Sequence, residues 1–252
     1  MSSHASPRPK DPPLDRPVVL ITGFGPFPTV AANATSLLVP RIAQAARRAI
    51  PGVAIAAHIL PTEWEAGLAS VGTLTRRLRP IVTLHFGVSS RAKGFEIETR
   101  GRNHCSLSED AVGKFPCDIR LSPEGPEFLQ ATLPAAHIVA RLRRRGLPAF
   151  LSRDAGGYLC NALLYRSLEI ARRSDTPART GFVHLPASLI SERRPTLEPR
   201  RHGRLTWDDV LEGSLEILSA SLGRGPAHPA LSRQRIGSAP GGTTTRSFGV
   251  EA

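Results

Sequence analysis

The chain has 252 residues, of which 40% are hydrophobic and 21% charged, values typical of a globular protein with a sizeable core. Its formal net charge of +12 suggests an anionic partner, but aromatic residues make up only 5% of the chain, too few for a platform that stacks bases. Most of the arginine pairs lie near the ends of expected helices, where cations are favourable. We therefore expect a solvated basic surface and no specific nucleic-acid binding.

The cysteines and the apolar runs of the sequence indicate the cellular compartment of the protein. Cys105, Cys117 and Cys160 form no CxxC pair, so neither a disulfide framework nor a zinc ribbon is predicted, and a reducing compartment fits best. A metal site would have to combine His104 with Cys105 and Cys117, but no fourth ligand has a suitable spacing, and no metal or other cofactor is expected. No secretory signal and no membrane-spanning run is present, which favours a cytoplasmic protein that does not contact membranes.

Hydrophobic periodicity predicts strands and helices that alternate along the chain. In chain order they are a strand at 17–23, a helix at 35–50, a strand at 53–60, a helix at 62–78 capped by Thr62, strands at 80–87 and 95–100, a helix at 133–146, a buried strand at 147–151, a helix at 158–173, a strand at 181–186, and a helix that starts at Thr206 with a capping box. This order indicates a single α/β domain over 16–223, with a largely parallel sheet covered on both faces. Residues 1–15 are expected to be a disordered Pro-rich leader, and residues 224–252 a flexible tail.

The loop after the first strand carries two aromatic side chains, Phe24 and Phe27. At the carboxyl end of a buried strand, such rings either line a ligand pocket or cap the core, and both interpretations stay open on the residues alone. Gly23 and Gly25 suggest a dinucleotide-binding fingerprint, but position 28 is Pro where the third glycine is needed, so that function is excluded.

The most informative stretch runs from Arg153 to Asn161 and joins a strand to a helix through the adjacent glycines Gly156 and Gly157. It places Cys160 in the first turn of that helix. There the unpaired backbone N–H groups and the positive end of the helix dipole favour a thiolate, and the same N–H groups could hold an oxyanion. The alternative is that Cys160 is a small core residue.

A cysteine nucleophile needs a base and a group that orients the base. His184 ends the strand that follows the Cys160 helix, so its ring can face the carboxyl edge of the sheet, whereas His85 lies inside a strand and is expected to be buried. Glu96 and Glu98 are both candidates for the orienting carboxylate, and the residues alone do not choose between them. No GxSxG or SxxK motif is present, which disfavours a serine hydrolase.

Several separate motifs occur in a fixed order between Val18 and Leu222. They are TGFGPF at 22–27, HFGV at 85–88, ETRGRN at 98–103, PEGP at 123–126, TLP at 132–134, AGGYLCN at 155–161 and FVHLP at 182–186. In this combination the chain resembles the pyroglutamyl peptidase I family, also called pyrrolidone-carboxylate peptidase, a family of cytosolic cysteine peptidases.

The resemblance implies a three-layer α/β/α sandwich around a mostly parallel, mixed sheet, usually in a homodimer or homotetramer. It also implies release of N-terminal pyroglutamate (5-oxoproline) from peptides by a Cys-His-Glu triad. In this chain Cys160 matches the nucleophile, His184 the base and Glu98 the orienting carboxylate.

The resemblance further implies a substrate pocket. Phe24 and Phe27 match the two rings that sandwich the pyrrolidone, Asn33 matches a loop residue near the pocket, and the backbone around Val88 matches the segment that bonds the lactam. The loop residues 28–29 are Pro-Thr where the family usually has glycines. This departure leaves an alternative, a non-catalytic protein on the same scaffold that binds a peptide or an anion.

Overall fold

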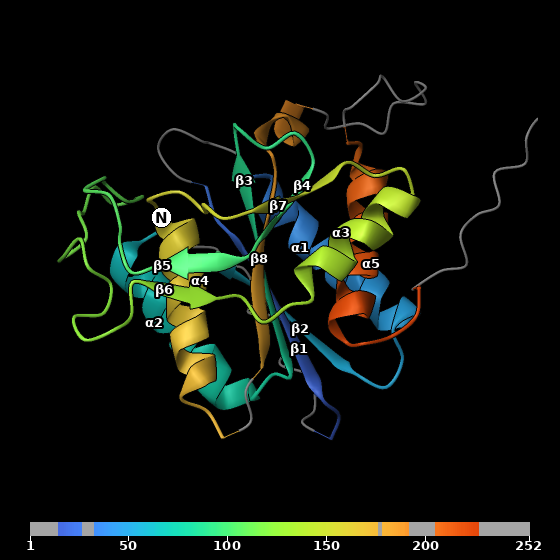
Figure 1. Cartoon of the computed structure of the whole chain (residues 1–252), viewed down its shortest axis with the longest axis horizontal. Helices are drawn as coiled ribbons and strands as arrows, with labels where there is room; N and C mark the ends of the chain where they lie inside the picture. Colours follow the sequence, from blue (N-terminus) through green and yellow to red (C-terminus); the bar gives the residue numbers. More distant parts are fainter. Residues whose placement is uncertain (1–14, 27–32, 176–177, 192–204, 227–252) are drawn as a thin grey trace, which may run out of the picture.

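The computed structural model describes residues 15–26, 33–175, 178–191 and 205–226 (Figure 1). The expected leader at 1–15 and tail at 224–252 lie almost wholly outside these ranges, and so does Phe27, so the domain bounds stay predictions. Within the described ranges, no helix combines the length and the apolar character needed to cross a bilayer.

The centre of the molecule is a six-stranded sheet in the order β2-β1-β3-β8-β4-β7. Its strands are β1 (Val18–Phe24), β2 (Ala54–Leu60), β3 (Val82–Ser89), β4 (Phe95–Glu98), β7 (Ala149–Ser152) and β8 (Arg179–Pro186). Neighbouring strands are parallel except for β4 and β8, which pair antiparallel, with Glu96 opposite His184. The sheet is therefore mixed and mostly parallel, as the sequence predicts. A second, two-stranded sheet joins β5 (Arg100–Arg102) to β6 (Phe128–Gln130).

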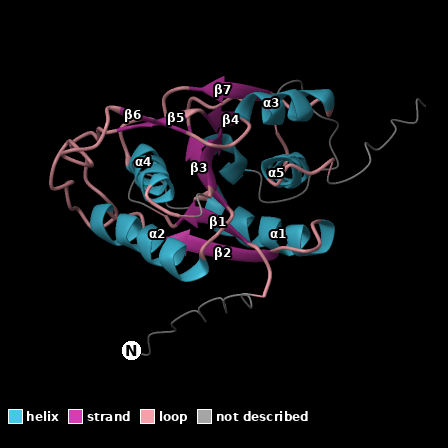
Figure 2. Ribbon diagram, turned by 60° about the horizontal axis from the view of Figure 1, so that its bottom comes forward, coloured by secondary structure: helices cyan, strands magenta, loops and turns pink. Residues whose placement is uncertain are grey.

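Helices cover both faces of the main sheet, as Figures 1 and 2 show. The described part of the chain contains α1 (Ala34–Ala49), α2 (Trp64–Leu78), α3 (Ala135–Arg144), α4 (Leu159–Arg172) and α5 (Trp207–Ser221). One face carries α1, α3 and α5, and the other carries α2, α4 and the small sheet. This arrangement confirms the predicted three-layer α/β/α sandwich.

Strand β1 shows why the sheet needs both layers. All of its residues are buried, with Val19 and Ile21 in the core that contains α1 and Leu20 and Phe24 in the core that contains α2 and α4. Successive side chains of a strand point to opposite faces, so an unbroken apolar run is stable only between two covering layers.

The start of α2 differs from the prediction. Thr62 does not cap this helix; its hydroxyl donates to the Gly25 carbonyl oxygen at 3.1 Å. The cap comes instead from Asp110, whose Oδ2 accepts from the Trp64 N–H at 3.0 Å. A carboxylate suits a helix N-terminus because it satisfies an unpaired N–H and faces the positive end of the dipole. By contrast, the capping box predicted at Thr206 is confirmed, with Asp209 as its second member.

The strand predicted at 147–151 forms, as β7, but it is not fully buried. It lies at the edge of the sheet, and the side chains of Phe150 and Leu151 are 41% and 52% exposed. The apolar run cannot reveal this, because periodicity does not say how many neighbours a strand has.

A buried ion pair joins α3 to α5. Arg141 and Glu216 contact each other with side chains that are both 3% exposed. We expect Glu216→Ala to lower the free energy of unfolding by about 3–5 kcal/mol, because it leaves a buried guanidinium without its partner. Urea denaturation would measure this change.

The matched control for that variant is Glu212→Ala. Glu212 lies on the same helix as Glu216 and pairs with Arg145 at 2.8 Å, with its side chain 36% exposed. Arg145 also pairs with Glu216 at 2.9 Å, so it keeps an ionic partner when Glu212 is lost, and we expect this variant to cost about 1 kcal/mol or less. Equal losses of unfolding free energy in Glu216→Ala and Glu212→Ala would contradict the claim that burial makes the Arg141–Glu216 pair important for stability.

Candidate active site

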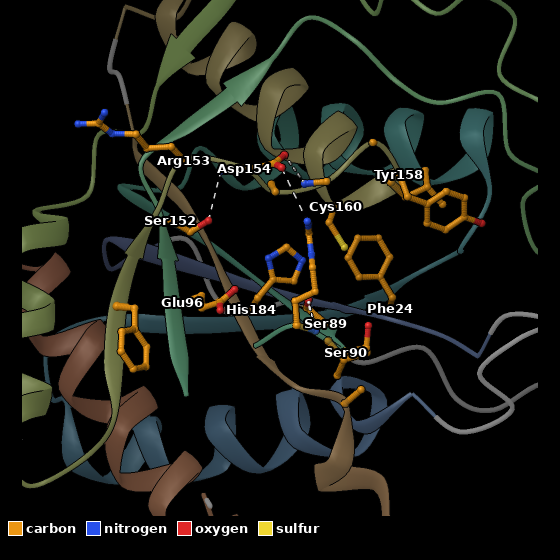
Figure 3. Close-up of a pocket in the computed structure, with 18 of the residues that line it drawn as sticks. Phe24, Ser89, Ser90, Glu96, Ser152, Arg153, Asp154, Tyr158, Cys160 and His184 are labelled. Atoms are coloured by element: carbon orange, nitrogen blue, oxygen red, sulfur yellow. Dashed lines mark hydrogen bonds and ion pairs between the residues drawn. The ribbon is translucent and has the colours of Figure 1, made fainter. Parts of the chain in front are cut away.

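A cavity of about 690 Å³ opens where β3 and β8 end and the loop before α4 begins (Figure 3). This size suits a small molecule or the end of a peptide. The residues that line it and enter the argument below are Phe24, Asn33, Val88, Arg91, Glu96, Phe150, Tyr158, Cys160 and His184. In α/β sheets this edge is where ligands commonly bind.

Cys160 is the second residue of α4 and its side chain is half-buried in the cavity wall. The Asn161 and Ala162 N–H groups donate to the Tyr158 carbonyl at 3.1 and 3.2 Å, whereas the preceding N–H groups of Leu159 and Cys160 have no acceptor within the helix and can face an anion beside the thiol. Gly87 makes room for the sulfur: a Cβ at this position would lie 3.1 Å from the Cys160 Sγ and 2.7 Å from the Phe182 ring. The predicted position of Cys160 at the helix start is therefore confirmed.

The two glycines before α4 have different structural roles. Gly156 has a φ of +84°, a left-handed conformation that favours glycine. A Cβ on Gly157 would lie 2.1 Å from the Ser106 Oγ, and the Ser106 N–H donates to the Gly157 carbonyl at 2.7 Å. A larger residue here would force the Ser106 side chain to move, so glycine allows the loop its close approach to this segment.

His184 and Glu98 form a buried pair. The imidazole Nδ1 lies 2.8 Å from the Glu98 Oε1, with the His184 side chain 6% exposed and that of Glu98 0% exposed. An ionised carboxylate can only accept, so Nδ1 carries the proton in this bond and Nε2 is left for another partner. Figure 3 shows the imidazole beside the Cys160 side chain. The structure thus brings together the three residues that the resemblance assigned to a triad, from β8, β4 and α4.

The electrostatics of this cluster favour a charged imidazole. Burial by itself would lower the pKa of His184, but the charge of Cys160 and a hydrogen bond with it, together with the hydrogen bond and charge of Glu98, raise that pKa to about 10. The imidazole is therefore charged at neutral pH, where it can stabilise negative charge on the Cys160 sulfur.

This coupling predicts a pH dependence. In Cys160→Ser the favourable charge of Cys160 beside the imidazolium is lost, so we expect the pKa of His184 to fall below the value of about 10. Below its pKa the ring is protonated and can act as an acid, so in the unchanged protein any proton donation by His184 should fade as the pH rises through about 10. Nuclear magnetic resonance titration of the imidazole would measure both.

The control for this titration is Cys117→Ser, since Cys117 is exposed and does not line the cavity. It should leave the titration of His184 unchanged. An unchanged pKa in Cys160→Ser would mean that the imidazole and the thiol do not interact.

Comparison with known proteins assigns the chain to a family. A family model described as pyroglutamyl peptidase matches residues 18–194. The chain belongs to the pyroglutamyl peptidase family. This family of cysteine peptidases is the one that the sequence motifs indicated.

Relatives by sequence agree. The pyrrolidone-carboxylate peptidase of Gloeobacter violaceus is 36% identical over 172 residues, which cover 67% of this chain and 80% of that protein. The pyrrolidone-carboxylate peptidase of Chromobacterium violaceum is 34% identical over 173 residues, 67% of this chain and 77% of that protein.

Solved structures agree on the fold. A mutant pyrrolidone carboxyl peptidase of the hyperthermophile Pyrococcus furiosus has a TM-score of 0.70 at 26% identity, covering 82% of this chain and 98% of that chain. Pyroglutamyl peptidase I of Bacillus amyloliquefaciens also has a TM-score of 0.70, at 24% identity and over the same shares of the two chains, and shows the fold alone.

Three of the four predicted substrate-binding residues line the cavity, and the fourth, Phe27, lies outside the described residues. Phe24 and Val88 both line it. Asn33 lines it too, but its Oδ1 already accepts from the N–H and the hydroxyl of Thr35, at 3.1 and 2.8 Å. The Thr35 Oγ1 in turn accepts from the Phe24 N–H at 3.0 Å. Asn33 thus caps α1 and supports the end of β1, where Phe24 lies in the strand and not in the loop expected from the sequence. Their roles in binding stay predictions.

Sequence reasoning missed the parts played by two neighbours of Cys160. The Tyr158 ring lines the cavity and packs edge-on against Trp64, with ring centroids 5.2 Å apart. The Asn161 side chain bonds the backbone of Arg102 and His104 at 2.7–2.9 Å and so holds the chain that follows Glu98. Their place beside Cys160 in the AGGYLCN motif was the available signal.

Two other groups considered from the sequence do not line the cavity. His85 is 0% exposed, and its ring nitrogens lie 2.6 Å from the Thr22 hydroxyl and 2.8 Å from the Ser167 hydroxyl. Burial lowers the pKa of His85 to about 3, so the ring is neutral and structural, as expected. Cys105 is buried, with its Sγ 3.1 Å from the Asp118 carbonyl oxygen.

Proposed function

We propose that this protein is a cysteine omega-peptidase that releases N-terminal pyroglutamate from peptides, with Cys160 as nucleophile, His184 as base and acid, and Glu98 as orienting group. The observation that carries the proposal is the buried contact of 2.8 Å between His184 and Glu98, with the imidazole next to a thiol at a helix start. Membership of the pyroglutamyl peptidase family supports the choice of substrate.

Binding of the substrate would need no charged pocket residue. The pyroglutamyl ring is a flat, neutral lactam, so an aromatic face and a backbone donor and acceptor suffice to hold it. Phe24 offers the aromatic face and the end of β3 around Val88 offers the backbone groups. Phe27, which lies outside the described residues, is proposed as the second ring.

In the reaction, the Cys160 thiolate attacks the carbonyl carbon that links the lactam ring to the next residue. The resulting oxyanion faces the N–H groups at the start of α4. The His184 imidazolium gives its proton to the leaving amine as the C–N bond breaks, which leaves a thioester. The neutral imidazole then takes a proton from water, and the hydroxide attacks the thioester carbonyl. The C–S bond breaks, which releases pyroglutamic acid and restores the pair of Cys160 thiolate and His184 imidazolium.

The role of Glu98 follows from its position. It accepts from Nδ1–H, keeps Nε2 directed at the thiol and offsets the charge of the imidazolium. It does not itself need to exchange a proton.

The experiment that tests the proposal is hydrolysis of a fluorogenic pyroglutamyl amide, with and without iodoacetamide pretreatment, beside a prolyl amide. Turnover of the pyroglutamyl substrate alone, lost on alkylation, is expected. Absence of turnover by folded, reduced protein would overturn the proposal and favour a binding protein on the same scaffold.

A further inference from the structure

The cavity continues past the thiol and the imidazole on the side away from Phe24. Figure 3 shows Glu96 and Ser152 on one side of His184, with Phe24 and Tyr158 on the other. The strand register explains this. Glu96 lies opposite His184 on β4 and beside Phe150 on β7, so the three side chains form a row across three strands.

The Glu96 carboxylate in this row is unusual, because it is half-buried in the cavity and makes no hydrogen bond or ion pair within the part of the chain that the structure describes. Its neighbour Glu98 is bonded to His184 instead. Burial and the charge of Glu98 raise the pKa of Glu96, and the charges of His184 and Arg91 act in the opposite direction. Arg91 is itself largely exposed and lies 3.9 Å from the Asp154 carboxylate. A partly desolvated carboxylate without a bonded partner is set to pair with a cation from a ligand.

The direction of the reaction places part of the substrate here, provided that the proposed function holds. The lactam lies on the Phe24 side of Cys160, and His184 must reach the nitrogen of the leaving amine. The residue that follows pyroglutamate therefore extends past His184, toward Glu96 and Phe150.

We propose that Glu96 is a specificity-determining residue, which makes the enzyme favour peptides in which Lys or Arg follows the pyroglutamyl residue over peptides in which Asp or Glu follows it. The cationic head of such a side chain would pair with the Glu96 carboxylate. Its aliphatic stem would pack on the ring of Phe150, which is 41% exposed. An acidic side chain at the same place would be repelled by Glu96.

The test compares pyroglutamyl-Lys, pyroglutamyl-Gln and pyroglutamyl-Glu, all as C-terminal amides so that no terminal carboxylate is present. For the unchanged enzyme we expect kcat/KM for the Lys substrate to exceed that for the Glu substrate by about tenfold or more, and the Gln substrate to fall between them. In Glu96→Gln the Lys-to-Glu ratio should fall to within about threefold. Glu124→Gln, which removes an exposed carboxylate outside the cavity, should keep the full ratio.

A second measurement does not depend on any variant. Raising the salt concentration should lower the Lys-to-Glu ratio of the unchanged enzyme, since salt screens a half-exposed charge pair, and should leave the Gln substrate unaffected.

The outcomes separate this inference from the proposed function. Turnover of all three amides at similar rates would overturn the role of Glu96 and leave the peptidase intact. Preference for the Glu substrate would overturn it as well and would assign the charge selection to Arg91. Absence of turnover for every amide, the neutral one included, would overturn the proposed function and with it this inference.

Discussion

Cys160→Ala is expected to reduce hydrolysis of a pyroglutamyl amide by at least ~10⁴-fold, because the nucleophile is lost and the remaining groups can only bind and polarise the substrate. The fold should be kept, since the side chain is small and half-exposed at a helix start. The measurement is kcat beside thermal unfolding followed by circular dichroism.

The matched control is Cys117→Ala, which removes an exposed thiol outside the cavity and should leave turnover unchanged. Mass spectrometry after brief iodoacetamide treatment should find the label on Cys160 as activity is lost. Retained activity in Cys160→Ala would refute the assignment of the nucleophile.

Glu98→Gln should have the next largest effect, a loss in kcat of about 10²- to 10⁴-fold that stays smaller than the loss in Cys160→Ala. The amide oxygen can still accept from the His184 Nδ1–H, but the charge that offsets the imidazolium is gone. The new NH₂ group would also be buried where the Glu98 Oε2 has no hydrogen-bond partner among the described residues. Steady-state kinetics and titration of His184, whose pKa should fall, measure both consequences.

The control for this variant is Glu124→Gln. It removes an exposed carboxylate outside the cavity and should leave turnover unchanged. If Glu98→Gln, still folded, were as inactive as Cys160→Ala, Glu98 would have to take part in the reaction directly. If it were fully active, the pair with His184 would be structural only.

The antiparallel strand β4 is what separates the two carboxylates. Because β4 runs against β8, each step forward along β4 moves deeper beneath the carboxyl edge of the sheet. Glu96, opposite His184, lines the cavity. Glu98, opposite Phe182, is fully buried and accepts a hydrogen bond from the His184 Nδ1. A single register thus buries Glu98 against the imidazole and leaves Glu96 in the cavity.

The sequence by itself determined most of the element order, the three-layer architecture and the position of Cys160 at a helix start. Those features depend on local patterns: unbroken apolar runs, helical periodicity, and two glycines before α4. The position of His184 at the end of its strand indicated the base, and the family resemblance added the choice of Glu98.

Only the tertiary structure decided the choices that join distant parts of the chain. The start of α2 is capped by Asp110, a residue 46 positions further along than Trp64, and β7 is exposed because it has a neighbour on one side only. The bond between His184 and Glu98 spans 86 positions and depends on the antiparallel pairing of β4 with β8. Local periodicity carries no information about strand order or register, and so it could not distinguish Glu98 from Glu96.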